Sequence, residues 1–218
     1  MKKINVVLIL LMVLIIGFSI YVYGNDSNFL GEDHITNLGE PIILKGVPDV
    51  RQPTDYSCGP TCLQAVLNYY GQDVRVDKLI NITNCTPENG TTPQNLANGA
   101  RSYGFKAEVK ENLTLNDLEN YLKQGIPVIV ACQAWAENNT VWTEDQEDGH
   151  YMVVIGIDQE NVYFEDPSIL GSRGFIPHQE FLDRWHDIAV GMPGKSYDHL
   201  GIIINSTPKS SPTFIRIE

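Results

Sequence analysis

One stretch of this chain, residues 52–62, constrains its fold more than any other. It reads Gln-Pro-Thr-Asp-Tyr-Ser-Cys-Gly-Pro-Thr-Cys, apolar residues follow it at helical spacing up to Tyr70, and Gly71 comes directly after them. Proline in the first turn and glycine just past the end are typical of a helix, so we expect a helix over residues 60–70. Cys58 then precedes this helix, where the helix dipole and free backbone N–H groups stabilise a thiolate. The pattern therefore predicts a cysteine nucleophile.

The N-terminal segment predicts a membrane-spanning or signal helix over residues 1–24. The run from Ile4 to Tyr23 carries no charge, and at about 1.5 Å per residue it is long enough to cross the ~30 Å hydrocarbon core of a bilayer. Cleavable signal peptides have shorter apolar regions of about 7–15 residues, so we favour an uncleaved signal anchor. Lys2 and Lys3 keep the N-terminus in the cytoplasm. We therefore expect a single-pass protein of the cell membrane with its domain outside or, if the segment is cleaved, a secreted protein.

The rest of the chain has the length and charge of one exported domain. Residues 25–44 are polar and read as a linker, residues 45–207 form the predicted domain, and residues 208–218 form a C-terminal tail. That length is sufficient for one hydrophobic core, and we expect a monomer. The formal net charge of −12 argues against a nucleic-acid partner, because such partners require a basic surface.

Asn-x-Ser/Thr sequons are more frequent than the composition of this chain predicts. Seven lie on the predicted exported side: Asn25, Asn81, Asn84, Asn89, Asn112, Asn138 and Asn205. The Asn and Ser/Thr frequencies lead us to expect roughly two. The excess indicates either an Asn-rich polar surface or a glycosylated outer-surface protein.

Hydrophobic periodicity along the domain predicts helices first and a sheet afterwards. Besides the helix over residues 60–70, we expect helices over residues 77–82, 93–103, 114–123 and 179–186, and strands over residues 105–109, 127–131, 151–157, 162–164 and 200–204. Helices followed by strands indicate an α+β fold, with the N-terminal helices packed on an antiparallel sheet.

Three further residues complete a candidate site around Cys58. Gly149-His150 opens an apolar strand, so we expect the His150 ring at the rim of that strand, where it can accept the thiol proton. Asp166 ends the next strand, and a hairpin would bring it beside His150 to orient the imidazole. The Gln52 side chain and the Cys58 backbone N–H are candidate donors to a developing oxyanion. Each residue alone has an ordinary reading as a strand end, a turn or a polar loop, but together they predict a cysteine-dependent enzyme.

The same residues resemble the double-glycine (bacteriocin-processing) peptidase-like family of the papain-like superfamily. The resemblance rests on residues 47–52, on Cys58-Gly59-Pro60, on residues 66–71, and on Gly149-His150 followed by Asp166-Pro167. It spans residues 45–205 and implies a papain-like cysteine peptidase fold with no cofactor. It implies that Cys58 is the nucleophile and His150 the general acid and base. Asp166 would orient His150, and Gln52 would donate to the oxyanion.

The residues after Cys58-Gly59-Pro60 depart from the family pattern, and three further cysteines are present. Thr61 and Cys62 follow Cys58-Gly59-Pro60 where small residues are usual, and Cys62 reads as a buried apolar residue rather than a second nucleophile. One disulfide among Cys62, Cys85 and Cys132 is compatible with an exported protein. No Cys-x-x-Cys or Cys/His cluster indicates a metal site. Transporter regions of leader-cleaving members are not part of this sequence, so we do not expect export-coupled leader processing.

Other histidines and one acidic loop are also candidates. His199 precedes an apolar strand and is the rival base, but no Asp-Pro follows it. We read the remaining histidines as surface residues: His34, His178 and His186. The loop over residues 135–149 carries an acidic run that leads into His150. We interpret this loop as a cleft wall that favours basic substrates; a calcium site and a solvated face are the alternatives.

The sequence therefore predicts an extracytoplasmic cysteine peptidase that hydrolyses peptide or amide bonds of a peptide or protein substrate. A Cys58–His150–Asp166 triad would carry the reaction. Two alternatives remain open: a cell-wall cross-link amidase or transpeptidase, and a catalytically idle surface binding domain. The presence of Cys58, His150 and Asp166 together with Gln52 argues against the idle binding domain, because a domain without catalysis does not require all four residues.

Overall fold

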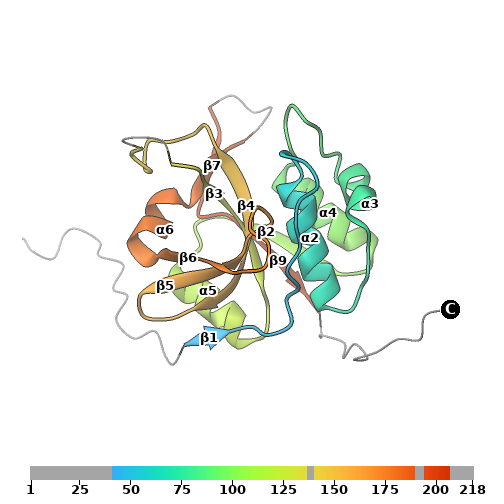
Figure 1. The fold of residues 1–218 in the computed structure, drawn as a ribbon, viewed down its shortest axis with the longest axis horizontal. Helices are drawn as coiled ribbons and strands as arrows, with labels where there is room; N and C mark the ends of the chain where they lie inside the picture. The colour runs from blue at the N-terminus through green and yellow to red at the C-terminus, as the bar shows by residue number, and fades with distance from the viewer. Residues whose placement is uncertain (1–40, 137–139, 190–193, 207–218) are drawn as a thin grey trace, which may run out of the picture. The chain divides into compact units, whose positions relative to one another are not determined.

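The computed structural model describes residues 41–136, 140–189 and 194–206 (Figure 1). The predicted anchor at residues 1–24, most of the linker and the tail at residues 208–218 lie outside the described residues. Within the three described ranges, no helix is both long enough and apolar enough to span a bilayer.

One antiparallel sheet with the strand order β2-β9-β3-β4-β5-β6 forms the centre of the domain, and β1 pairs with the last residues of β4. Its strands are β1 (Ile42–Ile43), β2 (Lys106–Lys110), β3 (Val128–Gln133), β4 (Gly149–Ile157), β5 (Asn161–Glu165), β6 (Gly174–Pro177) and β9 (Gly201–Asn205). A small second sheet pairs β7 (His186–Ile188) with β8 (Ser196–Asp198). The helices are α2 (Cys58–Tyr69), α3 (Val76–Ile82), α4 (Pro93–Ser102), α5 (Leu115–Lys123) and α6 (His178–Arg184).

The predicted order of helices and antiparallel strands is confirmed. All five predicted helices and all five predicted strands are present, with ends that differ by at most two residues. The short strands β1, β6, β7 and β8 were not predicted, and His186 begins β7 instead of ending α6.

α2 starts at Cys58 rather than at Pro60, because the Thr61 N–H already bonds the Ser57 carbonyl at 3.1 Å. Pro60 is tolerated there since the first N–H groups of a helix have no intrahelical partner.

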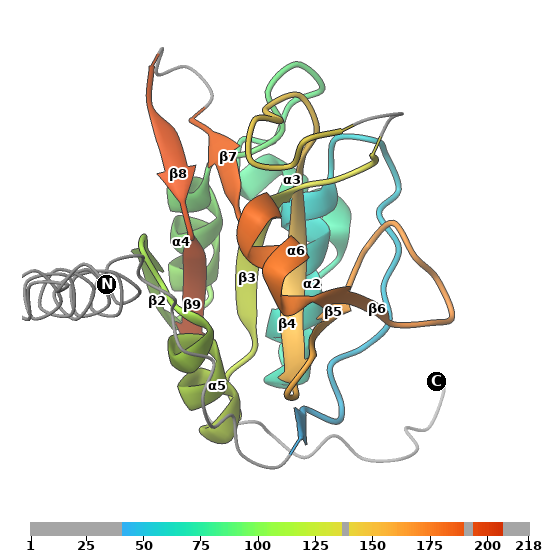
Figure 2. The same ribbon diagram turned by 90° about the vertical axis from the view of Figure 1, so that its left-hand side faces the viewer.

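Two hydrophobic clusters cover the two faces of the sheet, and β4 contributes to both. Tyr151, Val153 and Ile155 join the cluster that contains residues of α2, α3 and α4. Met152 and Val154 join the cluster that contains residues of α5 and α6, as expected from the alternation of side chains along a strand. Figure 2 shows α6 on one side of the sheet and α2, α3 and α4 on the other. Each large apolar side chain that is buried contributes about 1.5–3 kcal/mol to stability. Packing on both faces of the sheet therefore holds β4 in place.

The start of α2 packs tightly against β4 because Gly59 has no side chain. A Cβ at Gly59 would lie 2.7 Å from the Thr91 side chain and 3.1 Å from the Tyr151 ring. One turn further along, the Cys62 Sγ donates to the Tyr151 carbonyl oxygen at 3.2 Å. The beginning of the helix, with Cys58, is therefore held next to the beginning of β4.

Candidate active site

The β4–β5 hairpin brings His150 and Asp166 together. Val153 pairs with Glu165, so the next residue, Asp166, lies opposite Met152 and diagonally across from His150 on the same face. The His150 Nε2 and the Asp166 Oδ1 are 2.7 Å apart. An ionised carboxylate can only accept, so Nε2–H is the donor. The contact expected from the hairpin is therefore present.

The turn that follows β5 holds Asp166 in place. Its Oδ1 accepts from the Ser168 backbone N–H at 2.8 Å and from the Ser168 hydroxyl at 2.7 Å. Burial raises the pKa of Asp166, but the hydrogen bonds with His150 and Ser168 and the charge of the imidazole outweigh burial and lower that pKa below its usual range. Asp166 is therefore an ionised acceptor that fixes one nitrogen of the ring.

His150 interacts with Cys58 as well as with Asp166, and it is only 1% exposed. Burial lowers the pKa of His150, but the hydrogen bond with Asp166 and the interactions with Cys58 and with the Asp166 charge outweigh burial and raise that pKa to about 9. Asp166 occupies Nε2, whereas Nδ1 is buried and has no hydrogen-bond partner among the described residues. Nδ1 is thus the nitrogen available to the Cys58 thiol.

Cys58 is the first residue of α2 and is partly exposed. As the first N–H groups of a helix lack intrahelical partners, the Cys58 N–H is available as a donor. The first turn of α2 contains no acidic residue, so α2 itself places no carboxylate against an anionic sulfur at its N-terminal end.

Gln52 lies in the loop before α2, where its carboxamide already has one partner. Nε2 donates to the Thr54 carbonyl at 2.9 Å, and the Gln52 backbone N–H donates to the Pro167 carbonyl at 2.9 Å. Oε1 is buried without a partner among the described residues. These contacts leave a second Nε2 hydrogen for another acceptor, and the oxyanion role of Gln52 stays a prediction.

The backbone segment before α2 is joined to the loop after β5, residues 166–173. The Val50 N–H donates to the Glu165 Oε1 at 2.8 Å. Arg173 forms an ion pair with the buried Glu165 and donates to the Val47 carbonyl at 2.6 Å. The loop that leads to the thiol and the loop that carries the orienting carboxylate are therefore held together.

Trp135 belongs to this site but was not predicted. Its ring centroid lies 4.8 Å from that of His150, with 53° between the ring planes, and 52% of Trp135 is exposed. Its φ is +54°, a conformation that is rare for bulky residues. The sequence shows only that Trp135 begins the acidic loop, and a contact between its ring and that of His150 does not follow from this position.

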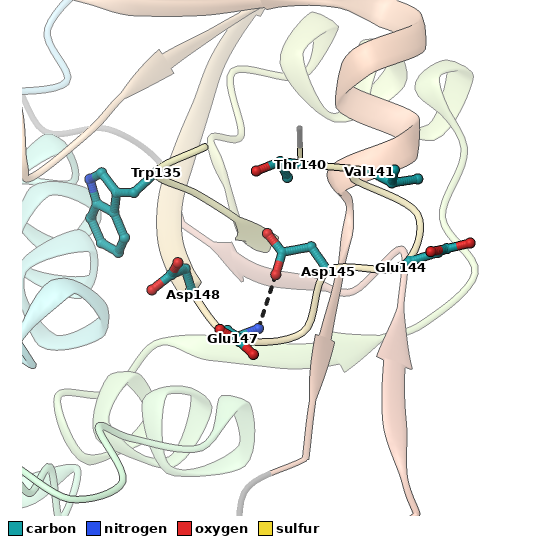
Figure 3. Close-up of a pocket in the computed structure, with 7 residues that line it drawn as sticks. All are labelled: Trp135, Thr140, Val141, Glu144, Asp145, Glu147 and Asp148. Carbon is teal, nitrogen blue, oxygen red and sulfur yellow. Dashed lines mark hydrogen bonds between the residues drawn. The ribbon is translucent and has the colours of Figure 1, made fainter. Parts of the chain in front are cut away.

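The acidic loop before His150 forms a wall of a cavity of about 260 Å³ beside Trp135. Figure 3 shows Asp145, Glu147 and Asp148 along this loop, where the Glu147 N–H donates to the Asp145 Oδ1 at 3.2 Å. Every charged residue that lines this cavity is acidic. In the part of the chain that the structure describes, no three His, Cys, Asp or Glu residues are placed to hold a metal ion. The calcium alternative gains no support, and the cleft wall stays a prediction.

A second cavity, of about 330 Å³, opens beside Cys58 and is called the thiol cavity below. Its lining includes Gly149 and Tyr151 at the start of β4, Asp187 in β7, and Tyr197 in β8. Sequence reasoning did not single out Asp187, because its three-residue strand has no hydrophobic alternation.

All four cysteines lie in the described ranges and are free thiols, so the disulfide considered among Cys62, Cys85 and Cys132 is not present. Burial raises the pKa of the Cys62 thiol well above its ordinary value. This result fits the expectation that Cys62 is a buried apolar residue and not a second nucleophile.

The other histidines have different surroundings. The rival base His199 stacks on Trp185 with ring centroids 4.9 Å apart, and its Nδ1 lies 3.1 Å from the Leu113 carbonyl oxygen. The predicted surface position is wrong for His178, which is only 5% exposed at the start of α6 because this helix packs against the sheet. His34 lies outside the described residues.

Five sequon asparagines are described, and all are exposed: Asn81, Asn84, Asn89, Asn112 and Asn205. Asn25 and Asn138 lie outside the described residues. Exposure is required for glycosylation but does not establish it, so glycosylation stays a prediction.

Sequence comparison identifies the family. The chain matches the model of the Peptidase C39-like family over residues 44–190. An uncharacterized protein of Methanothermobacter thermautotrophicus is 30% identical over 134 residues, which cover 62% of this chain and 77% of that protein. A second uncharacterized protein, from Methanothermobacter marburgensis, is 28% identical over 132 residues, which cover 61% of this chain and 75% of that protein.

Three solved structures share the fold. A C39-like peptidase candidate from Bacillus anthracis has a TM-score of 0.58 and 22% identity and covers 78% of this chain and 100% of that chain. A double-glycine motif protease of an AMS/PCAT transporter, in complex with the leader peptide, has a TM-score of 0.54 and 20% identity, with coverage of 78% and 100%. The peptidase domain of Streptococcus ComA has a TM-score of 0.52 and 21% identity, with coverage of 72% and 97%.

The family model matches more than half of the chain, and the matched residues include Cys58, His150 and Asp166. The resemblance drawn from the sequence motifs is thereby confirmed, and the chain belongs to the Peptidase C39-like family of cysteine peptidases.

Proposed function

We propose that this chain is an extracytoplasmic cysteine peptidase that hydrolyses peptide bonds through Cys58, His150 and Asp166. One observation carries the proposal: the buried His150 imidazole bonds Asp166 through Nε2 at 2.7 Å, which leaves its buried Nδ1 without a partner among the described residues and available to the Cys58 thiol. Family membership supports peptidase chemistry. The leader peptide in the AMS/PCAT transporter protease supports a peptide as the substrate.

In the proposed reaction, the His150 Nδ1 takes the proton of the Cys58 thiol, and the thiolate attacks the substrate carbonyl carbon. We assign the stabilisation of the resulting oxyanion to the Cys58 N–H and the Gln52 carboxamide. The C–N bond then breaks, and His150 gives its proton to the leaving amine, which leaves a thioester. Water, deprotonated by the same imidazole, hydrolyses the thioester and restores the thiol. Asp166 stays ionised and keeps the ring oriented.

A peptide-cleavage experiment tests this proposal. The full chain, as wild type and as Cys58→Ala, is incubated with a diverse peptide library, and the products are read by mass spectrometry. We expect cleavage by the wild type only, whereas Cys62→Ala should still cleave. Added amines that appear on new C-termini would identify transpeptidation in place of hydrolysis.

Alkylation provides a second readout that needs no substrate. We expect iodoacetamide at pH 6.5 to label Cys58 faster than the buried Cys62, Cys85 and Cys132. No cleavage by either protein, with slow labelling of Cys58, would overturn the peptidase proposal in favour of an idle surface binding domain.

The extracytoplasmic location rests on the apolar run of residues 4–23 that follows two lysines. A C-terminal tag on the full chain should be removed when intact cells are treated with an external protease. Protection of the tag in intact cells, with loss after lysis, would place the domain inside.

A further inference from the structure

The thiol cavity contains a carboxylate that the proposed reaction does not use. Asp187 lines this cavity together with Cys58. Both hydrogen bonds that Asp187 accepts end on Oδ1, from the Ile188 backbone N–H at 2.8 Å and from the Gln133 side chain at 3.4 Å. Oδ2 accepts none from the described residues. A partly buried carboxylate without a cationic partner is unfavourable, so this group requires an explanation.

The residue before His150 makes room for this carboxylate. A Cβ built on Gly149 would overlap the carboxyl group of Asp187. The buried Gln133 side chain also donates to the His186 carbonyl at 3.2 Å, which ties β7 to the end of β3 beside Gly149. Gly149 therefore does more than open a strand, because its missing side chain lets the Asp187 carboxyl group lie against the backbone at the start of β4.

The thiol cavity carries charge of one sign. Its charged lining residues are Asp187, Asp55, Glu88 and Glu147, and the lining includes no lysine, arginine or histidine. Glu147 also lines the acidic cavity beside Trp135. Positive charge on a substrate would therefore be favoured on both sides of the acidic loop.

Cations close in sequence to this cavity have other partners. Lys195 pairs with Glu111 at 3.7 Å and lies 5.2 Å from the centre of the Tyr197 ring. The Nε2 of His186 lies 2.7 Å from the Asp145 carbonyl oxygen. Within the described residues, Asp187 forms no ion pair.

We propose that Asp187 binds the guanidinium or ammonium group of a substrate arginine or lysine side chain that enters the thiol cavity. The inference rests on the proposed function, since this cavity selects a residue near the cleaved bond only if Cys58 is the nucleophile. The cavity volume of about 330 Å³ is at the lower end of the ~300–1,000 Å³ range for ligand pockets, which suits one side chain. The rings of Tyr151 and Tyr197 provide surfaces for the apolar stem.

Matched peptides test the cation subsite. The full chain is given N-acetylated, C-amidated peptides in which each position within four residues of the cleaved bond is in turn arginine, citrulline or glutamate. Citrulline has nearly the shape of arginine but no charge, and acetylation removes the only other cation. At one position we expect kcat/KM for arginine to exceed that for citrulline by about 10- to 100-fold, with glutamate lowest.

Two variants assign the preference. In Asp187→Asn the arginine-to-citrulline ratio should fall towards one. In Asp73→Asn, which makes the same charge change at an exposed position beyond the far end of α2, the ratio should stay as in the wild type. If Asp187→Asn does not fold, Asp187→Glu keeps the charge and should keep the preference.

The outcomes separate this inference from the proposed function. Equal kcat/KM for arginine and citrulline at every position, with cleavage intact, would overturn the cation subsite and leave the peptidase proposal standing. An arginine preference that survives Asp187→Asn would overturn the assignment to Asp187. Cleavage of no peptide at all would overturn the proposed function, and the subsite with it.

Discussion

Replacing Asp166 by asparagine tests the electrostatics of the proposed site with little change in its shape. An asparagine Oδ1 can still accept the three hydrogen bonds that now end there, from His150 and from the N–H and hydroxyl of Ser168. Only the negative charge is lost. The pKa of His150, raised from 6.5 to about 9, should then fall by about 1–3 units, which is the effect of one nearby opposite charge.

This shift changes how stability depends on pH. Because the pKa of His150 is higher in the folded state than in the unfolded state, its protonated form stabilises the fold. That contribution is fully present below pH 6.5 and is lost as the pH rises through about 9. At about 1.36 kcal/mol per unit, the wild-type contribution is about 3 kcal/mol, and Asp166→Asn should remove about 1–3 kcal/mol of it.

Urea unfolding at pH 6 and at pH 10 measures the difference between the two proteins. Asp158→Asn is the matched control: Asp158 lies at the other end of the same hairpin, and its Oδ1 accepts two backbone N–H bonds at 2.9 and 2.7 Å. The alkaline limb of the kcat/KM profile should move to lower pH in Asp166→Asn only. An unchanged limb together with an unchanged stability difference would refute the argument that the Asp166 charge sets the protonation of His150.

Three further substitutions test individual contacts. Cys62→Ala should lower the free energy of unfolding by about 1 kcal/mol and leave kcat/KM for peptide cleavage within about twofold, since among the described residues this buried thiol bonds only the Tyr151 carbonyl. A large loss of cleavage would give Cys62 a role in catalysis. Gly149→Ala should lower the free energy of unfolding by about 1–3 kcal/mol, because the added methyl group overlaps with Asp187. In a double-mutant cycle, adding Asp187→Ala should recover part of that loss. Additive effects of the two substitutions would contradict the contact. Trp135→Ala should lower kcat/KM by about tenfold by uncovering the imidazole. Equal kcat/KM would show that the contact between the two rings has no part in turnover.

The fold class and the thiol, imidazole and carboxylate positions could be predicted because each has a local signal. The helix after Cys58 is marked by its apolar spacing and by its proline and glycine. His150 and Asp166 stand sixteen residues apart across one short turn, and an antiparallel hairpin of that length brings them together through its register alone. These signals require no knowledge of the rest of the chain.

The other parts of the site depend on contacts between distant segments. Asp187 approaches Gly149 only because Gln133 ties β7 to the end of β3, and none of these three residues carries a sequence signal for it. Trp135 covers His150 through a backbone conformation that its residue type disfavours. The burial of His178 likewise follows from the docking of α6 on the sheet and not from the local pattern.

The bonds between the segment before α2 and the loop after β5 have a consequence for biosynthesis. They connect residues 115 positions apart, from Val50 to Glu165, and 126 positions apart, from Val47 to Arg173. Contacts of such long range form late in folding, because a long loop must close before they exist. Because α2 precedes β4 and β5 in the chain, the helix with Cys58 also leaves the ribosome well before the hairpin with His150. If the proposed mechanism holds, Cys58 of a partly made chain lacks its imidazole partner until β4 and β5 have been completed.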